Sequence, residues 1–366
     1  MNIKDVPIDN VKNILLIEPD YPTSKKNKYI PIGLLKIASY FRSKSKNVSF
    51  TNFNEEINTK GYNPDLICLS SYFVYKAPYT KKTVDYCRKY FPNVKIVVGG
   101  IYAMLLPEHC KEYTQCDYVI TEISKEAEEL VPAYDLVHTN HQVLFTTRGC
   151  VRRCDFCSVY KIEPEWTCKK TIKNEVLFKN ILFYDNNLLA NPYIEDILNE
   201  LVELKKQRKI KYVRAQSGLD ARILSKKPHL GKLLKKAGFK GITLSWDGDF
   251  KDLKYIKKAV NILTESKYKS KNISIFMLFN YYNMNYEDIE RKRLECAKLG
   301  VKAIALRYVP MDWTSEDIYI SPNWTDKEIR KTMANRTMHN RCINYDITEH
   351  GIPYMHDTWK LYEFHE

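Results

Sequence analysis

The sequence predicts an α/β protein in which a flavodoxin-like or Rossmann-type parallel sheet is followed by a partial (β/α)6 barrel of the TIM type. Two observations favour this fold class. The first roughly 130 residues alternate short apolar runs with helical patterns, which is typical of βαβ units. From His141 the alternation begins again and gives six further strand–helix units, which indicate a parallel barrel or partial barrel. We expect domains at residues 1–135 and 136–318, and a C-terminal helical extension at 319–366.

The front domain is expected to contain four buried strands. Continuous apolar runs predict them at residues 13–19, 65–72, 95–103 and 116–121. Apolar residues at helical spacing predict helices at 33–44 and 81–91. Ser70 lies at the end of the second strand, and Gly99 and Gly100 lie at the end of the third, where a glycine pair lets the backbone approach a ligand closely. A tight turn without a ligand is the alternative explanation for the glycine pair.

The second domain is expected to contain six strands. They are predicted at residues 141–150, 180–187, 210–222, 241–249, 273–282 and 301–310. Helical patterns at 193–207 and 229–238 follow the second and third strands, and a polar helical segment at 326–336 follows the last. In an α/β barrel the carboxyl ends of the strands share one rim, and function gathers there.

Polar or ligating side chains follow every one of these six strands. In chain order they are Arg148 and Cys150; Asp185, Asn186 and Asn187; Gln216, Ser217, Asp220 and Arg222; Ser245 and Asp247; Asn280; and Arg307. Any one of them could be a turn residue or a helix cap. Their presence at all six strand ends favours a functional rim.

The composition limits the location and the partners of the protein. The start of the chain lacks the basic and apolar regions of a signal peptide, and no apolar run approaches the ~20 residues that cross a bilayer. We therefore expect a cytoplasmic protein without disulfides, whose ten cysteines are buried thiols or metal ligands. The net charge of +14 favours anionic partners such as nucleic acid or a phosphorylated substrate, but the lysines are spread along the chain and equally fit ordinary solvated faces.

Three cysteines stand close together in the stretch TTRGCVRRCDFCSVY. Cys150, Cys154 and Cys157 have the spacing CxxxCxxC, which in a cytoplasmic chain indicates a metal. A structural zinc site needs four closed ligands, and the two other candidates, Cys168 and His141, lack the usual spacing. An iron–sulfur cluster tolerates three cysteines because its fourth iron can bind a group that is not protein.

CxxxCxxC directly after the first strand of such a barrel resembles the radical S-adenosylmethionine superfamily. Phe156, before the third cysteine, is aromatic, as is usual in that superfamily. TRGC before the motif, a buried strand that ends in DNN, and KAGFKGITLSWDG at the fourth strand resemble the class with a cobalamin-type domain in front. The resemblance implies that Cys150, Cys154 and Cys157 bind a 4Fe–4S cluster. It also implies that an electron from a flavodoxin or ferredoxin cleaves S-adenosylmethionine to methionine and a 5′-deoxyadenosyl radical, which removes a hydrogen atom from the substrate.

The resemblance also implies roles for the other rim residues. Phe156 would help to hold the adenine, and Asp185, Asn186 and Asn187, in place of the GGE-like segment of many members, would meet the amino group. Gln216, Ser217 and Arg222 would hold the ribose and the carboxylate, since a carboxylate gains a charge-assisted bond from arginine. Ser245 is placed with the cofactor-binding residues. Asp247, Asn280 and Arg307 would then be catalytic residues on the substrate side.

The front domain resembles a cobalamin-binding domain over most of its length. The matching pieces are NILLIEPDYP, IPIGLLKIASYFRS, PDLICLSSY, VVGGIYAMLLPE and DYVITEISKEAEEL. Ser70, Gly99 and Gly100 would contact the cofactor. The DxHxxG signature is absent, Tyr102 stands where related chains often have the histidine of GGxH, and the GExE-like stretch is replaced by TEISKE. The fold is therefore expected, while cobalamin binding stays open because a fold can be kept without its ligand.

Three functions follow from these patterns. The first is a radical S-adenosylmethionine enzyme acting on an unidentified substrate, with methyl transfer if cobalamin binds. The second is methylthiotransferase-like modification of RNA, for which Cys68, Cys110 and Cys116 offer no obvious second cluster. The third is a zinc-stapled basic protein that binds nucleic acid, which would not need six polar strand ends.

Overall fold

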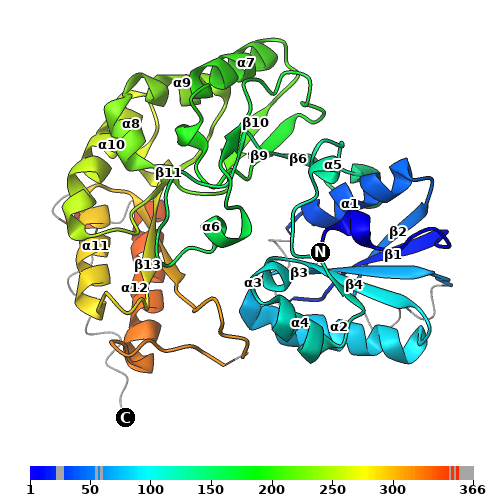
Figure 1. The fold of residues 1–366 in the computed structure, drawn as a ribbon. Coiled ribbons are helices and arrows are strands. Elements are labelled where there is room, and N and C mark those ends of the chain that lie inside the picture. The colour runs from blue at the N-terminus through cyan, green and yellow to red at the C-terminus, as the bar shows by residue number, and fades with distance from the viewer. Residues whose placement is uncertain are drawn as a thin grey trace. The chain divides into compact units, whose positions relative to one another are not determined.

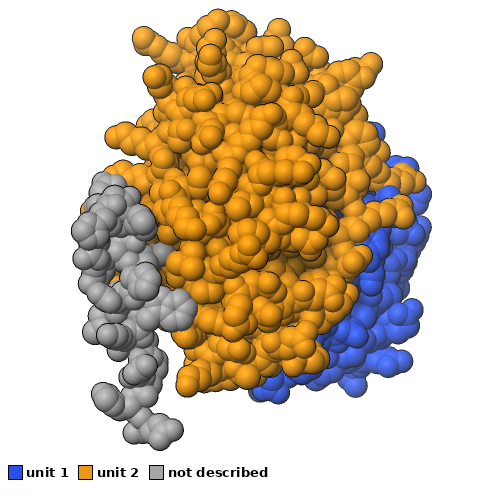
Figure 2. Space-filling model, turned by 90° about the vertical axis from the view of Figure 1, so that its left-hand side faces the viewer, with its two compact units in different colours: residues 1–139, 158–164, 310–319 blue, residues 140–157, 165–309, 320–366 orange. Residues whose placement is uncertain are grey.

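The computed structural model describes residues 1–21, 29–53, 57, 61–315, 317–345, 348–349 and 352–353. The chain divides into two compact units (Figure 2). Unit 1 comprises residues 1–139, 158–164 and 310–319, and unit 2 comprises residues 140–157, 165–309 and 320–366. Two short segments from beyond residue 139, residues 158–164 and 310–319, therefore group with unit 1. The expected helical extension groups with unit 2 from residue 320, and nearly all of it beyond residue 345 lies outside the described residues.

Unit 1 is built on one parallel sheet of five strands. The strands are β1 (Asn13–Glu18), β2 (Asn47–Asn52), β3 (Leu66–Ser71), β4 (Lys95–Gly100) and β5 (Tyr118–Val119). Their order is β2-β1-β3-β4-β5, which is the flavodoxin-like order. The predicted sheet type is confirmed. The strand β2 was not predicted, because it lies at the edge of the sheet and its residues alternate between exposed and partly buried.

Helices cover both faces of this sheet (Figure 1). They are α1 (Ile32–Ser43), α2 (Ala77–Tyr90), α3 (Ile101–Leu105), α4 (Pro107–Thr114) and α5 (Lys125–Glu128), with short 3-10 turns at Ile3–Asp5, Val74–Lys76 and Tyr134–Leu136. Successive strand residues point to opposite faces, so Leu16 packs in the core under α1 and α5, and Ile17 packs in the core under α2 and α4. The short helix α6 (Val159–Ile162) also groups with unit 1.

Unit 2 contains two parallel sheets. The strands β6 (His141–Leu144), β9 (Asn180–Phe183) and β10 (Tyr212–Ala215) form one; β11 (Leu219–Asp220), β12 (Ile242–Ser245), β13 (Ile273–Phe279) and β14 (Lys302–Arg307) form the other. A parallel bridge between Val213 and Phe239 links β10 to the segment before β12. Neighbouring strands thus follow chain order, and the predicted third strand is split into β10 and β11. Closure into a partial barrel stays a prediction.

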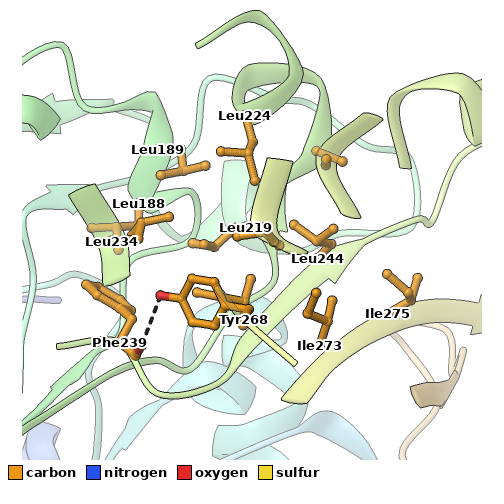
Figure 3. Close-up of a cluster of buried hydrophobic side chains, with 14 of the residues drawn as sticks. Leu188, Leu189, Leu219, Leu224, Leu234, Phe239, Leu244, Tyr268, Ile273 and Ile275 are labelled. Carbon is orange, nitrogen blue, oxygen red and sulfur yellow. Dashed lines mark hydrogen bonds between the residues drawn. The ribbon is translucent and has the colours of Figure 1, made fainter. Parts of the chain in front are cut away.

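The helices of unit 2 lie along the outer side of these strands (Figure 1). They are α7 (Ile194–Lys206), α8 (Ala221–Lys226), α9 (His229–Ala237), α10 (Leu253–Glu265), α11 (Tyr286–Lys298) and α12 (Asp326–Tyr345). Strand and helix side chains share one apolar core, part of which is seen in Figure 3. Inside it the Tyr268 hydroxyl donates to the carbonyl oxygen of Phe239 at 2.9 Å, so the one polar group of this aromatic side chain is satisfied.

Two small antiparallel pairs complete the described structure. The strands β7 (Thr147–Arg148) and β8 (Thr167–Cys168) frame the segment that carries the three cysteines. The strands β15 (Thr348–Glu349) and β16 (Ile352–Pro353) pair near the end of the chain. In the part of the chain that the structure describes, no helix combines the length and the apolar character needed to cross a membrane.

Two helical glycines should respond oppositely to replacement by alanine. A Cβ atom at Gly231 in α9 would lie 2.6 Å from Ser266 Oγ and 2.7 Å from Ile262 Cγ2, whereas a Cβ at Gly33 in α1 meets nothing within 4 Å. We expect Gly231→Ala to lower the free energy of unfolding by about 1–3 kcal/mol through overpacking. Gly33→Ala should raise it by about 0.5–1 kcal/mol. Urea denaturation measures both, and stabilisation by Gly231→Ala would contradict the packing of α9 on α10.

Candidate functional site

The three cysteines lie on a single loop that follows β7. Cys150, Cys154 and Cys157 form no disulfide with one another or with another described cysteine, and all three are partly buried. The Cys157 amide donates to the Cys154 carbonyl oxygen at 3.0 Å, and the Arg152 amide donates to Cys150 Sγ at 3.4 Å. Among the described residues, no three Cys, His, Asp or Glu side chains form a group that could hold a metal ion. The geometry therefore gives the cysteines a common loop without a closed metal site.

Asp185 holds the beginning of this loop. It follows β9, is 2% exposed, and its Oδ1 atom accepts four hydrogen bonds. The donors are the amides of Thr146 and Thr147, at 2.9 and 2.7 Å, and their hydroxyls, at 2.6 and 2.8 Å. Burial raises the pKa of Asp185, and these hydrogen bonds oppose the rise. The other oxygen, Oδ2, is buried and has no hydrogen-bond partner among the described residues, so it is an available acceptor.

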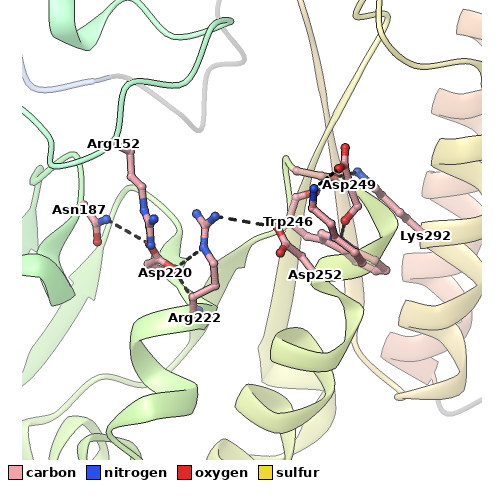
Figure 4. Close-up of polar contacts among 10 residues, drawn as sticks. Arg152, Asn187, Asp220, Arg222, Trp246, Asp249, Asp252 and Lys292 are labelled. Atoms are coloured by element: carbon pink, nitrogen blue, oxygen red, sulfur yellow. Dashed lines mark hydrogen bonds and ion pairs between the residues drawn. The ribbon is translucent and has the colours of Figure 1, made fainter.

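Asp220 holds the middle of the same loop (Figure 4). Its Oδ2 atom accepts from Arg152 Nε at 3.0 Å and Nη2 at 2.8 Å, and from Asn187 Nδ2 at 3.4 Å. Its Oδ1 atom accepts from the amide of Arg222 at 3.0 Å and from Nε of the same residue at 3.2 Å. Burial alone would raise the pKa of Asp220, but the bonds and charges of Arg152 and Arg222 lower it, so the group is a carboxylate at neutral pH.

A buried lysine of α11 contacts the loop after β12. Lys292 of α11 is 2% exposed, and its Nζ atom donates to the carbonyl oxygens of Gly248 at 2.6 Å and Trp246 at 3.3 Å. Figure 4 shows this lysine beside Trp246 and Asp249. Burial lowers the pKa of Lys292, and the charge of Asp247 opposes that change. Sequence reasoning missed Lys292, because a lysine on a polar helix has no pattern that distinguishes it from a solvated one.

Asp247 interacts electrostatically with both this lysine and Cys154 of the cysteine loop. Burial raises its pKa to about 6, opposed by the charges of Lys292 and Arg222 and by a backbone hydrogen bond from Leu278. Its Oδ1 atom is buried and has no hydrogen-bond partner among the described residues. Burial also raises the pKa of Cys154, with further contributions from Cys157, Asp247 and Cys150. The thiols and this carboxyl are therefore close enough to influence one another electrostatically.

A fourth strand end touches the loop through an aromatic pair. The Phe156 and Tyr281 rings meet edge to face with centroids 5.9 Å apart, and Tyr281 lies just beyond β13. With Asp185 after β9, Asp220 at the end of β11 and Asp247 after β12, the loop is connected to the carboxyl ends of four parallel strands. Carboxyl ends of parallel strands are the usual place for ligand binding in α/β folds.

The remaining rim candidates differ in their surroundings. The side-chain amide of Asn186 donates to the Gly149 carbonyl oxygen at 3.4 Å. The backbone amide of Gln216 donates to the Phe183 carbonyl oxygen at 2.8 Å. A Cβ atom at Gly218 would lie 2.1 Å from Ser245 Oγ and 2.9 Å from Phe276 Cδ2, so Gly218 lies close against Ser245, and Ser217 beside it is partly buried. Arg148 Cζ lies 4.2 Å from the centroid of the Phe145 ring, and Arg307 is the exposed last residue of β14.

Asn280 has a structural arrangement of its own. It is fully buried, and its φ of 61° is in the left-handed region, which asparagine tolerates better than most residues. Its Nδ2 atom donates to the Tyr308 carbonyl oxygen at 3.1 Å, and its Oδ1 atom accepts from the Ser321 amide at 3.0 Å. Both ends of the amide therefore hold neighbouring backbone, while the predicted catalytic roles of Asn280 and Arg307 stay predictions.

The front-domain candidates meet at the carboxyl edge of the unit 1 sheet. Ser70 is paired in register with Gly99, and Ser71 is paired with Gly100. Gly100 has a φ of 103°, and a Cβ atom there would lie 2.2 Å from the Ser71 carbonyl oxygen, so this position requires glycine. The Ser70 hydroxyl donates to Glu18, a buried acid at the end of β1 that sequence reasoning had not selected.

Residues 23–131 match the family model of the B12 binding domain. The match agrees with the flavodoxin-like sheet and supports cobalamin binding and a cobalamin-dependent enzyme. A search of the curated proteins found no match.

The residue types present are those that the implied groups would need, although the described residues form no closed metal site. At the edge of the unit 1 sheet, Gly99 is half-buried and Gly100 is exposed, which leaves backbone open to a large cofactor. In unit 2, three cysteine side chains share one loop, and thiolates are the usual ligands of iron–sulfur clusters. The unpartnered oxygens of Asp185 and Asp247 suit a ligand with N–H donors, such as the ammonium group of an amino acid.

The roles of the two carboxyl oxygens of Asp185 can be distinguished by mutation. Asp185→Ala removes the acceptor of four hydrogen bonds and should lower the free energy of unfolding by about 2–4 kcal/mol. Asp185→Asn keeps one oxygen acceptor and replaces only the atom without a partner, so it should change stability by less than about 1 kcal/mol. Urea denaturation of both variants measures the difference. Equal losses would contradict the assignment of one oxygen to the threonines and the other to a ligand.

The raised pKa of Asp247 makes stability depend on pH. With a folded-state pKa of about 6 against an ordinary value of 3.8, the folded chain holds a proton that the unfolded chain has lost between these values. Wild-type stability should therefore fall, relative to Asp247→Asn, by up to roughly 3 kcal/mol as the pH rises from 4 to 6, and stay level above that. Denaturation midpoints of both proteins across this range test the sign of the change. A wild type that gains stability relative to Asp247→Asn between pH 4 and 6 would contradict the prediction.

Proposed function

We propose that the protein is a radical S-adenosylmethionine enzyme that also uses cobalamin. The observation that carries the proposal is the attachment of the cysteine loop, by Asp185 and Asp220, to the carboxyl ends of parallel strands. When bound at Cys150, Cys154 and Cys157, a 4Fe–4S cluster would deliver one electron that cleaves S-adenosylmethionine to methionine and a 5′-deoxyadenosyl radical, which takes a hydrogen atom from the substrate.

The residues of unit 2 would bind and orient rather than react. Asp185 Oδ2 and the Asn187 amide oxygen, both buried without a hydrogen-bond partner among the described residues, would accept from the ammonium group of S-adenosylmethionine. Arg222, partly exposed beside Asp220, would attract its carboxylate. Phe156 would pack against the adenine. Asp247 faces the same rim and would hold a proton near the substrate at mildly acidic pH.

The B12-binding domain favours methyl transfer as the outcome, with cobalamin at the edge formed by Ser70, Gly99 and Gly100. A flavodoxin or ferredoxin would supply the electron. The substrate would be anionic, in keeping with the net charge of +14.

Modification of RNA by sulfur insertion is disfavoured, because it would need a second cluster in unit 1. Cys68 packs in the core under α1, whereas Cys110 and Cys116 pack in the core on the opposite face of the sheet, so the three thiols cannot share one cluster.

The test is anaerobic reconstitution with iron and sulfide, followed by dithionite and S-adenosylmethionine. We expect about four irons per chain and 5′-deoxyadenosine as a product. The triple variant Cys150→Ala, Cys154→Ala and Cys157→Ala should lose both. Cys168→Ala is the matched control, since this partly buried cysteine lies in β8 beside the loop and should leave cluster and product unchanged.

Two outcomes would contradict the proposal. The first is one tightly bound zinc per chain, no 5′-deoxyadenosine and loss of the metal in Cys168→Ala, which would indicate a four-cysteine zinc site. The second is a full cluster without 5′-deoxyadenosine at any concentration of S-adenosylmethionine, which would leave an iron–sulfur protein without radical chemistry.

A further inference from the structure

The last strand of the larger sheet in unit 2 has an edge without a partner strand. The strand β14 stands at the end of the order β11-β12-β13-β14, and the Tyr308 amide donates to the Phe279 carbonyl oxygen of β13 at 2.9 Å. Backbone groups of successive strand residues face opposite neighbours, so every second residue of β14, counted back from Tyr308, bonds to β13. The alternate residues direct their N–H and C=O groups to the open edge, and these are Ala303, Ala305 and Arg307.

A side chain closes the first part of this edge. Asn340 of α12 accepts from the Ala303 amide at 2.9 Å and donates to the Ala303 carbonyl oxygen at 2.7 Å. Its carboxamide thus takes the place of a peptide group of a neighbouring strand. The edge-facing groups of Ala305 and Arg307 have no hydrogen-bond partner among the residues that the structure describes. Unpaired backbone groups at a sheet edge are a template for an added strand.

Arg336 lies beside the unpaired part of the edge. The helix α12 begins just after Trp324, whose ring centroid lies 5.7 Å from that of Phe279 at the end of β13, and it runs toward the beginning of β14. One helical turn rises about 6 Å, the length of about two strand residues, so Arg336, one turn before Asn340, lies beside Ala305. Arg336 is partly buried, and its Nε atom has no hydrogen-bond partner in the described part of the chain.

The charge at this edge is positive. Arg307 is the exposed last residue of β14, and neither Arg307 nor Arg336 forms an ion pair with a described carboxylate. A guanidinium group gains most from a carboxylate, which can accept two of its N–H groups at once. The edge therefore suits a partner that brings an acidic side chain.

An apolar side chain accompanies these groups on the other face of the sheet. Ala303 and Ala305 pack in the core with the helices, so Leu306 between Ala305 and Arg307 points to the face that the helices do not cover. Leu306 is 41% exposed, whereas its partner in register on β13, Leu278, is 7% exposed. A strand added beside β14 would shield Leu306 from water, as the neighbouring strands shield Leu278.

We infer that an extended acidic peptide adds to unit 2 as a further strand, bonded to the backbone of Ala305 and Arg307. Strand addition binds a peptide through its main chain, and Arg336 selects a glutamate or aspartate side chain on it. Nucleic acid fits this edge less well, because its backbone lacks the regularly spaced N–H donors that the two carbonyl oxygens need. The pairing depends on unit 2 alone. That the peptide is the substrate, held at the carboxyl ends of the same strands, rests on the proposed function.

The test begins with a phage-displayed library of random nonapeptides, selected on the full chain as purified, without S-adenosylmethionine or dithionite. The tightest binder that contains glutamate or aspartate is synthesised, and hydrogen exchange of the chain is followed by mass spectrometry at the level of single amides. We expect the Ala305 and Arg307 amides to exchange fast in the free chain and at least about tenfold more slowly with the peptide. The Ile304 and Leu306 amides, which bond to β13, should exchange slowly in both states.

Variants of the peptide and of the chain separate strand pairing from other modes of binding. N-methylation of alternate peptide amides along one edge should weaken binding by at least about tenfold, and along the other edge by less than about threefold. Ala305→Pro removes an amide that bonds to nothing in the fold and should weaken binding by about fivefold or more. Arg336→Gln should weaken the acidic binder by about tenfold and leave unchanged the binding of its counterpart with glutamine or asparagine in place of the acid.

Val48→Pro is the matched control. Val48 is a partly buried residue of β2, the edge strand of the unit 1 sheet, and its amide faces away from β1 because the Asn47 amide bonds on that side. This variant should bind the peptide as the wild type does.

Three outcomes would overturn the inference. The first is wild-type affinity in both Ala305→Pro and Arg336→Gln, and the second is a library that yields no acidic binder or a binder that leaves the exchange of the Ala305 and Arg307 amides unchanged. The third is protection of these two amides that grows with protein concentration in the absence of peptide, which would show pairing between two copies of the chain. The assay for 5′-deoxyadenosine judges the radical chemistry separately, since it needs no peptide.

Discussion

The four hydrogen bonds that Asp185 Oδ1 accepts from Thr146 and Thr147 are the constraint on which the candidate site depends. They fix the direction in which the chain leaves β6, three residues before the first cysteine. The ion pair of Arg152 with Asp220 fixes a second point, between the first and second cysteines. Two fixed points restrict the path of a short loop, so the thiols stay near the strand ends although, among the described residues, no closed metal site holds them there.

Buried acids at strand ends recur in both units, and their hydrogen bonds distinguish what each can do. Asp220 is matched by two arginines and is a carboxylate, so its role is to hold charge and position. Asp185 has one saturated oxygen and one without a partner, while Glu18 has a serine donor and no cation among the described residues. An acid that folding leaves partly unsatisfied carries a desolvation cost that a ligand with N–H donors can relieve.

The sequence allows the strands to be predicted far better than the contacts of the site. Buried parallel strands are continuous apolar runs, as in β1 and β13, whereas β2 is an edge strand with alternating polar residues and has no such signal. The residue types at the strand ends were visible for the same reason. Their partners were not, because Arg152 reaches Asp220 across 68 positions and Lys292 reaches Trp246 across 46, and such pairings follow only from the folded packing.

Lys292 affects both the backbone around Asp247 and the ionisation of the Asp247 carboxyl group. Its ammonium group donates to the carbonyl oxygens of Trp246 and Gly248, so it holds the backbone on both sides of Asp247. The same charge is the largest influence opposing the rise that burial causes in the pKa of Asp247. An apolar side chain of similar length at this position would leave two carbonyl groups without this donor and would keep Asp247 protonated to higher pH. One residue on a helix that covers the outer side of the strands therefore sets both the position and the ionisation of a carboxyl group beside the cysteine loop.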